Sequence, residues 1–170
     1  MTFLLRTARL RIEACSAEFA QAACSDRGLA EALSGLRLHA QWPEPDTPRA
    51  LASYARVLAQ VPRLRGFGIW TLAHEGEVVG DAGFKGPPRA GEVEVGYGIV
   101  PAQRGRGLAT EAVAALCAWA FGQGVRAIYA RCEADNAPSL RVLAKVGMRV
   151  CAGGRYVLEA PANLALHPAT

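Results

Sequence analysis

The segment 96–112 constrains the fold more than any other part of the chain. It begins as a strand, passes through a short turn with glycines at 105 and 107, and continues as a helix. Glycine lets backbone N–H groups approach an anion closely, and a helix N-terminus points its positive end at the same place. The segment therefore predicts an α/β chain with a phosphate-binding loop, rimmed by Arg104 and Arg106. A plain glycine turn between a strand and a helix is the alternative interpretation.

Hydrophobic periodicity predicts the elements on either side of this junction. Apolar residues that alternate with polar ones indicate strands, and apolar residues three and four apart indicate helices. Strands are expected at 4–13, 67–72, 78–84, 92–100, 125–132 and 156–159, and helices after Ser16, from Thr47 to Pro62, from about 108 to 122 and from Asn136 to Gly147. The turn at 74–77 makes the middle strands an antiparallel meander. The sequence thus predicts one mixed α/β domain spanning residues 1–170.

The charge distribution bears on the partners of the chain. The 170 residues carry a net charge of +4, and 51% of them are hydrophobic, which is typical of a globular protein. Basic residues outnumber acidic ones nine to six in 1–65 and four to one in 136–170, but eight acidic residues face six basic ones in 66–135. The positive charge is therefore not a stripe on one element, and we expect no nucleic-acid partner.

Several other classes are disfavoured by the pattern. Arg6, Arg9 and Arg11 interrupt the start where a signal peptide would be apolar, and the apolar run 112–121 is shorter than the ~20 residues of a membrane span. The five cysteines contain no C-x-x-C pair and the three histidines lack metal-ligand spacing. We therefore expect a cytoplasmic protein that uses no metal and no membrane.

The glycine turn matches neither the G-x-G-x-x-G fingerprint nor a P-loop. Its pattern of Arg104, Gly107 and Ala109 resembles the acyl-CoA loop of the GNAT superfamily of N-acetyltransferases. The preceding Tyr97-x-Ile99-x-Pro101 and the following Thr110-Glu111-Ala112 are also similar to that family. Downstream, 135–148 resembles its second motif, with Met148 where Phe is common. Residues 7–12 resemble the opening strand of one branch, the ribosomal-protein N-terminal acetyltransferases of the RimJ/RimL type.

The resemblance implies a GNAT-like fold, α/β (α+β), with a mixed, mostly antiparallel central sheet flanked by helices. It also implies acetyl-CoA as the acetyl donor. Residues Tyr97, Gly98 and Ile99 would pair with the pantetheine arm, and Asn136 would contact the arm from the other side, unless it is simply a helix N-cap. The pyrophosphate would be held by the residues of the loop: Arg104, Gly105, Arg106, Gly107, Leu108, Ala109 and Thr110.

The reaction requires an amine to lose a proton and a thiolate to gain one. In the family a Tyr seven residues after the Asn often supplies the second proton, but Leu143 stands there. Ser139 carries the remaining hydroxyl near that position. The alternative is that this hydroxyl only hydrogen-bonds to nearby groups of its own helix. Glu94, two residues before Gly96, is our candidate base. Alternatively, Glu94 belongs to an ordinary solvated face of the strand, and the base is Glu133, Asp81 or a chain of waters.

The sequence therefore predicts an N-acetyltransferase in which an amine attacks acetyl-CoA directly in a ternary complex. The alternative is a non-catalytic acyl-CoA-binding or regulatory module of the same fold. The acceptor is left open between a protein N-terminus and a small-molecule amine, and a homodimer is compatible with the sequence. The resemblance also implies that the irregular segment 36–46, with Trp42, helps line the acceptor side.

Overall fold

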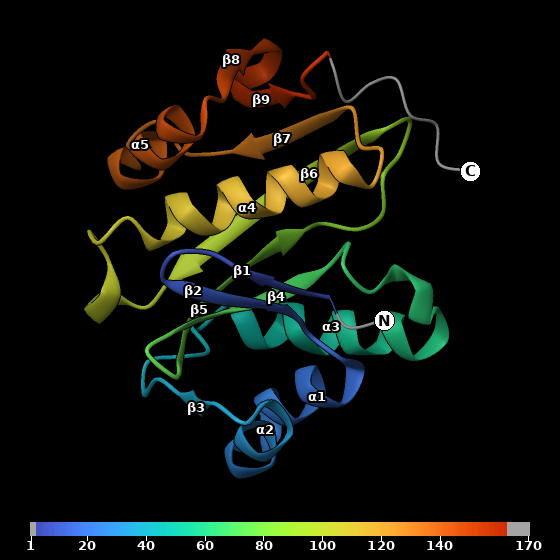
Figure 1. Cartoon of the computed structure of the whole chain (residues 1–170), viewed down its shortest axis with the longest axis vertical. Helices are drawn as coiled ribbons and strands as arrows, with labels where there is room; N and C mark the ends of the chain where they lie inside the picture. The colour runs from blue at the N-terminus through green and yellow to red at the C-terminus, as the bar shows by residue number, and fades with distance from the viewer. Residues whose placement is uncertain (1–2, 163–170) are drawn as a thin grey trace.

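Nine strands form one mixed sheet in the computed structural model, which describes residues 3–162 (Figure 1). The sheet order is β1-β2-β4-β5-β6-β7-β9-β8, with β3 paired to β5. The strands are β1 (Leu4–Arg6), β2 (Leu10–Ala14), β3 (Arg37–Leu38), β4 (Ile69–His74), β5 (Glu77–Phe84), β6 (Glu92–Ile99), β7 (Ala127–Arg131), β8 (Arg149–Cys151) and β9 (Arg155–Glu159). The pairs β3–β5 and β6–β7 are parallel and the others antiparallel. The predicted mixed, mostly antiparallel sheet with flanking helices is confirmed.

Five α-helices flank this sheet within the described residues: α1 (Ala17–Ser25), α2 (Arg27–Ser34), α3 (Thr47–Gln60), α4 (Leu108–Gly122) and α5 (Ala137–Val146). Local capping explains several of their ends. The Ser16 hydroxyl accepts a hydrogen bond from the Phe19 N–H at 3.1 Å, as expected of an N-cap. Gly147 ends α5 with φ +91°, in the left-handed region that favours glycine.

Four elements differ from the prediction, one of them the two-residue strand β3, which lies in the segment 36–46 that was expected to be irregular. The strand expected at 4–13 is divided into β1 and β2, because the Thr7 hydroxyl accepts a hydrogen bond from the Leu10 N–H and closes a turn there. Helix α2 was not predicted; its N-cap is Asp26, whose carboxylate accepts a hydrogen bond from the Leu29 N–H. The three-residue strand β8 was also missed, since so short a segment shows no periodicity.

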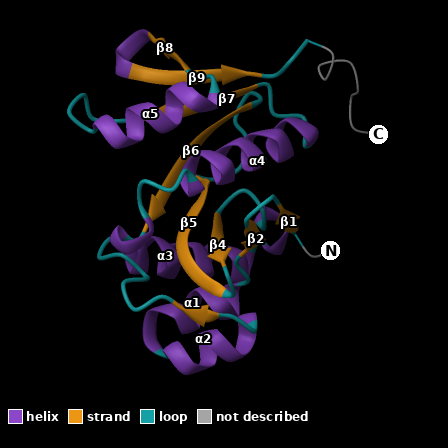
Figure 2. Cartoon of the chain, turned by 60° about the vertical axis from the view of Figure 1, so that its left-hand side comes forward, coloured by secondary structure: helices purple, strands orange, loops and turns teal. Residues whose placement is uncertain are grey.

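The two halves of the molecule meet along β5 and β6. Helices α1, α2 and α3 gather at one end, and α5 lies with β8 and β9 at the other (Figure 2). Helix α4 packs on β2, β5 and β6 through a continuous apolar surface that includes Leu116 and Val113, both fully buried. Trp119 of α4 joins Trp70 and Phe67 in an aromatic cluster. This packing fixes the position of β6 and of the helix that follows it.

Strands β6 and β7 pair over only a short distance. Their parallel register joins Glu92 to Ala127 and ends at Glu94 and Tyr129, although β6 continues to Ile99. Residues 95–99 of β6 pair with β5 on one side. On the other side, no strand pair of the described residues involves them. The sheet therefore opens beside the second half of β6.

Candidate active site

The loop between β6 and α4 has the geometry of an anion-binding turn. Gly105 and Gly107 have φ values of +76° and +79°, which other residues adopt only with strain. Gly107 is the N-cap of α4, and among residues 3–162 no side chain accepts a hydrogen bond from the first turn of this helix. The free N–H groups of Leu108, Ala109 and Thr110 and the helix dipole therefore point at one place, which suits a phosphate group.

The two arginines of this loop are held by neighbouring acceptors. Arg104 donates from Nε to the Ile99 carbonyl oxygen at 2.7 Å and forms an ion pair with Glu44. Arg106 donates to the side-chain oxygen of Gln103. The side chain of Arg104 is 58% exposed, so it can turn toward a phosphate without disturbing the core.

A second contact, not foreseen from the sequence, ties the start of α4 to the turn between β1 and β2. The Glu111 carboxylate accepts hydrogen bonds from the Thr7 hydroxyl at 2.6 Å and from the Arg9 backbone N–H at 2.9 Å. It also forms an ion pair with the Arg9 guanidinium, which in turn donates to the Arg106 carbonyl oxygen at 2.7 Å. Burial raises the pKa of Glu111, but these contacts outweigh it and hold the pKa below its ordinary value. No signal links residues about 100 apart in a single sequence.

Tyr97 and Ser139 face each other across the opening beside β6. Their hydroxyl oxygens lie 2.7 Å apart, and the Tyr97 hydroxyl also lies 3.2 Å from the Ser139 carbonyl oxygen. Burial raises the pKa of Tyr97, although its hydrogen bond to Ser139 partly lowers it. Asn136 caps α5 by accepting a hydrogen bond from the Ser139 N–H at 3.1 Å. Two hydroxyl groups are thus paired beside the open edge of β6.

Glu94, our candidate base, lies on the same face of β6 as Gly96 and Gly98. Its carboxylate forms ion pairs with Lys85 and, at 3.3 Å, with Arg131 of β7. Leu143, where the family often has a Tyr, is fully buried in the core. Glu94 therefore lies near the opening, but its carboxylate is paired with two cations.

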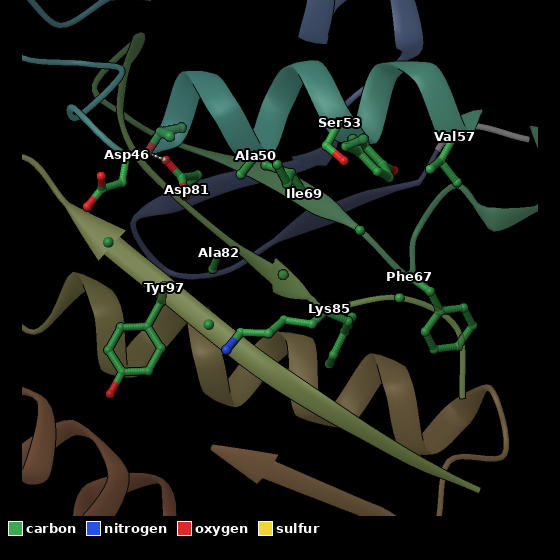
Figure 3. A pocket seen from close by; sticks show the side chains of 18 of the residues that line it. Asp46, Ala50, Ser53, Val57, Phe67, Ile69, Asp81, Ala82, Lys85 and Tyr97 are labelled. Atoms are coloured by element: carbon green, nitrogen blue, oxygen red, sulfur yellow. Dashed lines mark hydrogen bonds between the residues drawn. The ribbon is translucent and has the colours of Figure 1, made fainter. Parts of the chain in front are cut away.

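A cavity of about 700 Å³ lies on the other side of β6, between this strand and α3 (Figure 3). Asp46, Asp81 and Tyr97 lie toward one end of it, and Val57 and Phe67 toward the other. Tyr97 and Gly98 belong both to the cavity wall and to the open part of β6. The two spaces therefore meet at these residues.

Asp81 is held at the cavity wall by the segment before α3. It accepts hydrogen bonds from the Trp42 indole N–H at 2.9 Å and from the Thr47 hydroxyl at 3.3 Å. Burial raises the pKa of Asp81, and these two hydrogen bonds offset that only in part. Trp42 itself is 1% exposed and is not among the residues that line the cavity; of the segment 36–46, Glu44, Pro45 and Asp46 line it.

Two classes of site were also sought in the part of the chain that the structure describes. No helix between residues 3 and 162 is long and apolar enough to cross a membrane. Over the same residues, no three His, Cys, Asp or Glu side chains are grouped so that they could hold a metal ion.

A mixed sheet that opens beside one strand, with a glycine turn and an uncapped helix at the end of that strand, is the arrangement that the resemblance predicted for an acyl-CoA site. Residues 9–149 match the family described as acetyltransferase (GNAT) domain. An uncharacterized N-acetyltransferase of Bacillus subtilis (strain 168), YjdG, is 32% identical over 148 residues, which are 85% of this chain and 88% of that protein. The chain therefore belongs to the GNAT acetyltransferase family, and it is an acetyl-CoA-dependent N-acetyltransferase.

Solved structures share the fold at low sequence identity. The ribosomal-protein-S5-alanine acetyltransferase from Vibrio fischeri aligns with a TM-score of 0.69 at 15% identity, over 94% of this chain and 97% of that one. RimJ of Mycobacterium smegmatis, solved in complex with a CoA-disulfide, aligns with a TM-score of 0.62 at 21% identity, over 94% and 87%. The similarity to this branch that residues 7–12 predicted is thus found at the level of the fold.

Proposed function

We propose that this enzyme acetylates a primary amine by direct attack on acetyl-CoA, with both substrates bound at once on either side of β6. One observation carries the proposal: Tyr97 and Gly98 line both the open edge of the strand and the cavity. An amine in the cavity and a thioester at the open edge would meet at these two residues. This proximity supplies much of what a transfer between two bound substrates requires.

The donor side is assigned to the opening and the loop that follows it. Tyr97, Gly98 and Ile99 form the stretch of β6 along which the pantetheine arm would lie, with the Ile99 carbonyl oxygen held by Arg104, and Asn136 lies across the opening at the start of α5. The pyrophosphate contacts the turn formed by Arg104, Gly105, Arg106 and Gly107 and the first N–H groups of α4, at Leu108, Ala109 and Thr110. The free N–H groups there, and the two glycines with positive φ, support this assignment.

Ser139 is proposed to donate the proton that the leaving thiolate takes up. Its hydroxyl is 2.7 Å from the Tyr97 hydroxyl, so the proton that it gives up can be replaced from Tyr97. Such a pair can do the work of the Tyr that Leu143 replaces. Tyr97 is then a positioning residue for Ser139 as well as a neighbour of the pantetheine arm.

Two carboxylates compete for the role of base. Glu94 is on the strand face of Gly96 and Gly98, which line the cavity, but it does not line the cavity itself, and Lys85 and Arg131 share its charge. Asp81 lies in the cavity wall, and burial raises its pKa toward the range in which a carboxylate accepts a proton more readily. We expect Glu94→Gln or Asp81→Asn, but not both, to remove the acidic limb of the pH profile of kcat/KM.

The test of the whole proposal is the rate of CoA release from acetyl-CoA with a panel of peptides and small amines. Ser139→Ala is expected to lower kcat by roughly 100-fold or more, as for loss of a general acid, while the Kd for CoA changes little. Tyr97→Phe should lower kcat less, because it leaves the Ser139 hydroxyl in place. CoA binding without acetylation of any amine would instead support the non-catalytic module.

A further inference from the structure

The cavity beside α3 has a chemical gradient along its length. Its end near Gly98 carries three carboxylates, those of Glu44, Asp46 and Asp81, and its other end is apolar. Figure 3 shows Asp46 and Asp81 near the start of α3, and Val57 with Phe67 at the opposite end. A volume of about 700 Å³ lies within the usual range of small-molecule sites. The two ends therefore place different demands on the acceptor.

The acidic end lies next to the open part of β6. A Cβ atom added to Gly98 would stand 2.9 Å from the Glu44 carboxylate, so this carboxylate lies directly on the strand. Glu44 is paired with Arg104, whereas Asp46 forms none of the ion pairs found among residues 3–162. Among the described residues that line the cavity, the one cation is Lys85, which is itself paired with Glu94. A protonated amine is thus attracted to this end, and a second carboxylate beside it is repelled.

The apolar end is formed by one face of α3, the segment that leads into β4, the start of β4 and the end of β5. Its walls are the side chains of Val57, Leu64, Phe67, Ile69 and Phe84. The Tyr54 ring lies so close to the backbone that a Cβ atom added to Gly68 would be 1.8 Å from it. The side chain of Val57 is left 44% exposed at this wall. Covering such a surface with an apolar group is favourable, because it removes apolar area from water.

We propose that the acceptor is a primary amine on an apolar or aromatic body, with no carboxylate next to the amine. The inference rests on the proposed function, because it takes the cavity as the acceptor side. The ammonium group lies between Asp81 and Gly98, and the apolar body lies along α3 toward Phe67. Free arylalkylamines and peptides with a large apolar first residue share this chemistry.

The experiment compares amines that differ in one group. Initial rates of CoA release are measured for phenethylamine, for phenylalanine, which adds a carboxylate, and for ethanolamine, which removes the apolar body. We expect kcat/KM for phenethylamine to exceed both of the others by about tenfold or more. The same rates are measured for peptides that begin with leucine or with serine. Comparison of these rates with that for phenethylamine separates a protein acceptor from a free amine. Equal or higher values for phenylalanine and ethanolamine would overturn the proposal.

Two variants locate the apolar body. Val57→Asp is expected to lower kcat/KM for phenethylamine about tenfold and to leave that for ethanolamine unchanged. Val150→Asp on β8, where the valine is 70% exposed and far from the cavity residues in the fold, is the matched control. An equal loss in both variants, or on both amines, contradicts the assignment.

A binding measurement keeps this inference separate from the proposed function. Phenethylamine and phenylalanine are titrated calorimetrically into the wild-type protein with CoA present. Preferential binding of phenethylamine that Val57→Asp weakens supports the acceptor class even where no amine is acetylated, a result that would reject catalysis alone. Stronger binding of phenylalanine rejects the acceptor class whatever the rates are.

Discussion

The contact between Arg9 and Glu111 offers the sharpest test of how the cofactor loop is held. Arg9→Ala removes an ion pair of 2.7 Å and the hydrogen bond from the guanidinium to the Arg106 carbonyl oxygen. Hydrogen bonds to charged groups contribute about 1.5–3 kcal/mol each when buried, but exposed ion pairs contribute only about 0.2–1 kcal/mol. The Arg9 side chain is 43% exposed and that of Glu111 17%. We therefore expect the free energy of unfolding to fall by about 1–2 kcal/mol.

The chain contains a matched control for this variant. Arg149 and Glu159 form an ion pair of the same 2.7 Å length, but their side chains are 71% and 65% exposed. Arg149→Ala should therefore cost well below about 1 kcal/mol. Urea denaturation of both variants and of the wild type measures the difference.

The same variant should weaken CoA binding, because Arg9 fixes a carbonyl of the phosphate loop and neutralises Glu111 at the start of α4. Charges at a helix terminus contribute about 0.3–2 kcal/mol, so the Kd for CoA should rise about tenfold in Arg9→Ala and stay unchanged in Arg149→Ala. The low pKa of Glu111 means that its contribution to stability is present above its unfolded pKa and is lost as pH falls through the folded one. The stability gap between wild type and Arg9→Ala should thus narrow in acid. Equal effects of the two arginine variants on stability and on CoA binding would refute this reasoning.

Three further predictions concern the loop, the cavity and the core. Gly107→Ala and Gly76→Ala both place a side chain at a φ near +79° and should each lose about 1 kcal/mol of stability, but only the first should raise the Kd for CoA, as measured by calorimetry. The pKa of Asp81 is raised in the folded protein, so its ionisation lowers stability as pH rises through that folded pKa. In urea titrations, Asp81→Asn should therefore lose less stability than the wild type between pH 4 and 8. Parallel pH curves of the two proteins would contradict this. Leu143→Tyr, which introduces the family's usual acid, should lower the unfolding free energy by about 1–3 kcal/mol, because Leu143 is fully buried; a stable and faster variant would be the opposite result.

Much of the fold was predictable because its signals are local. The strand-turn-helix junction depends on glycines that are adjacent in sequence, and the meander depends on alternation within single strands. The N-cap of α5 at Asn136 is equally local. Helix α2 was missed because its larger apolar residues do not mark a buried face: Ala30 is its one buried residue, while Leu29 and Leu33 are half exposed.

The arrangement of the candidate site depends instead on contacts between distant segments. The Tyr97 and Ser139 hydroxyls are brought together by two elements 42 residues apart, and Trp42 reaches Asp81 from 39 residues away. The sequence marks Trp42 as a large side chain in an irregular segment, which suits a wall or a core equally well. Only the tertiary packing, in which the Trp42 ring stacks on Phe19 of α1, decides that Trp42 is buried and that Glu44, Pro45 and Asp46 line the cavity.

The short pairing of β6 with β7 leaves the edge of β6 exposed when no donor is bound. Residues 95–99 present one edge with no strand partner among the described residues, and such an edge is a template on which a second chain can add a strand. An acyl-CoA bound along this edge would block self-association through it, in addition to serving as the substrate. We expect saturating CoA to slow amide hydrogen exchange at 95–99 and to delay aggregation at high protein concentration. The concentration of the cofactor would then help determine how long the folded enzyme lasts.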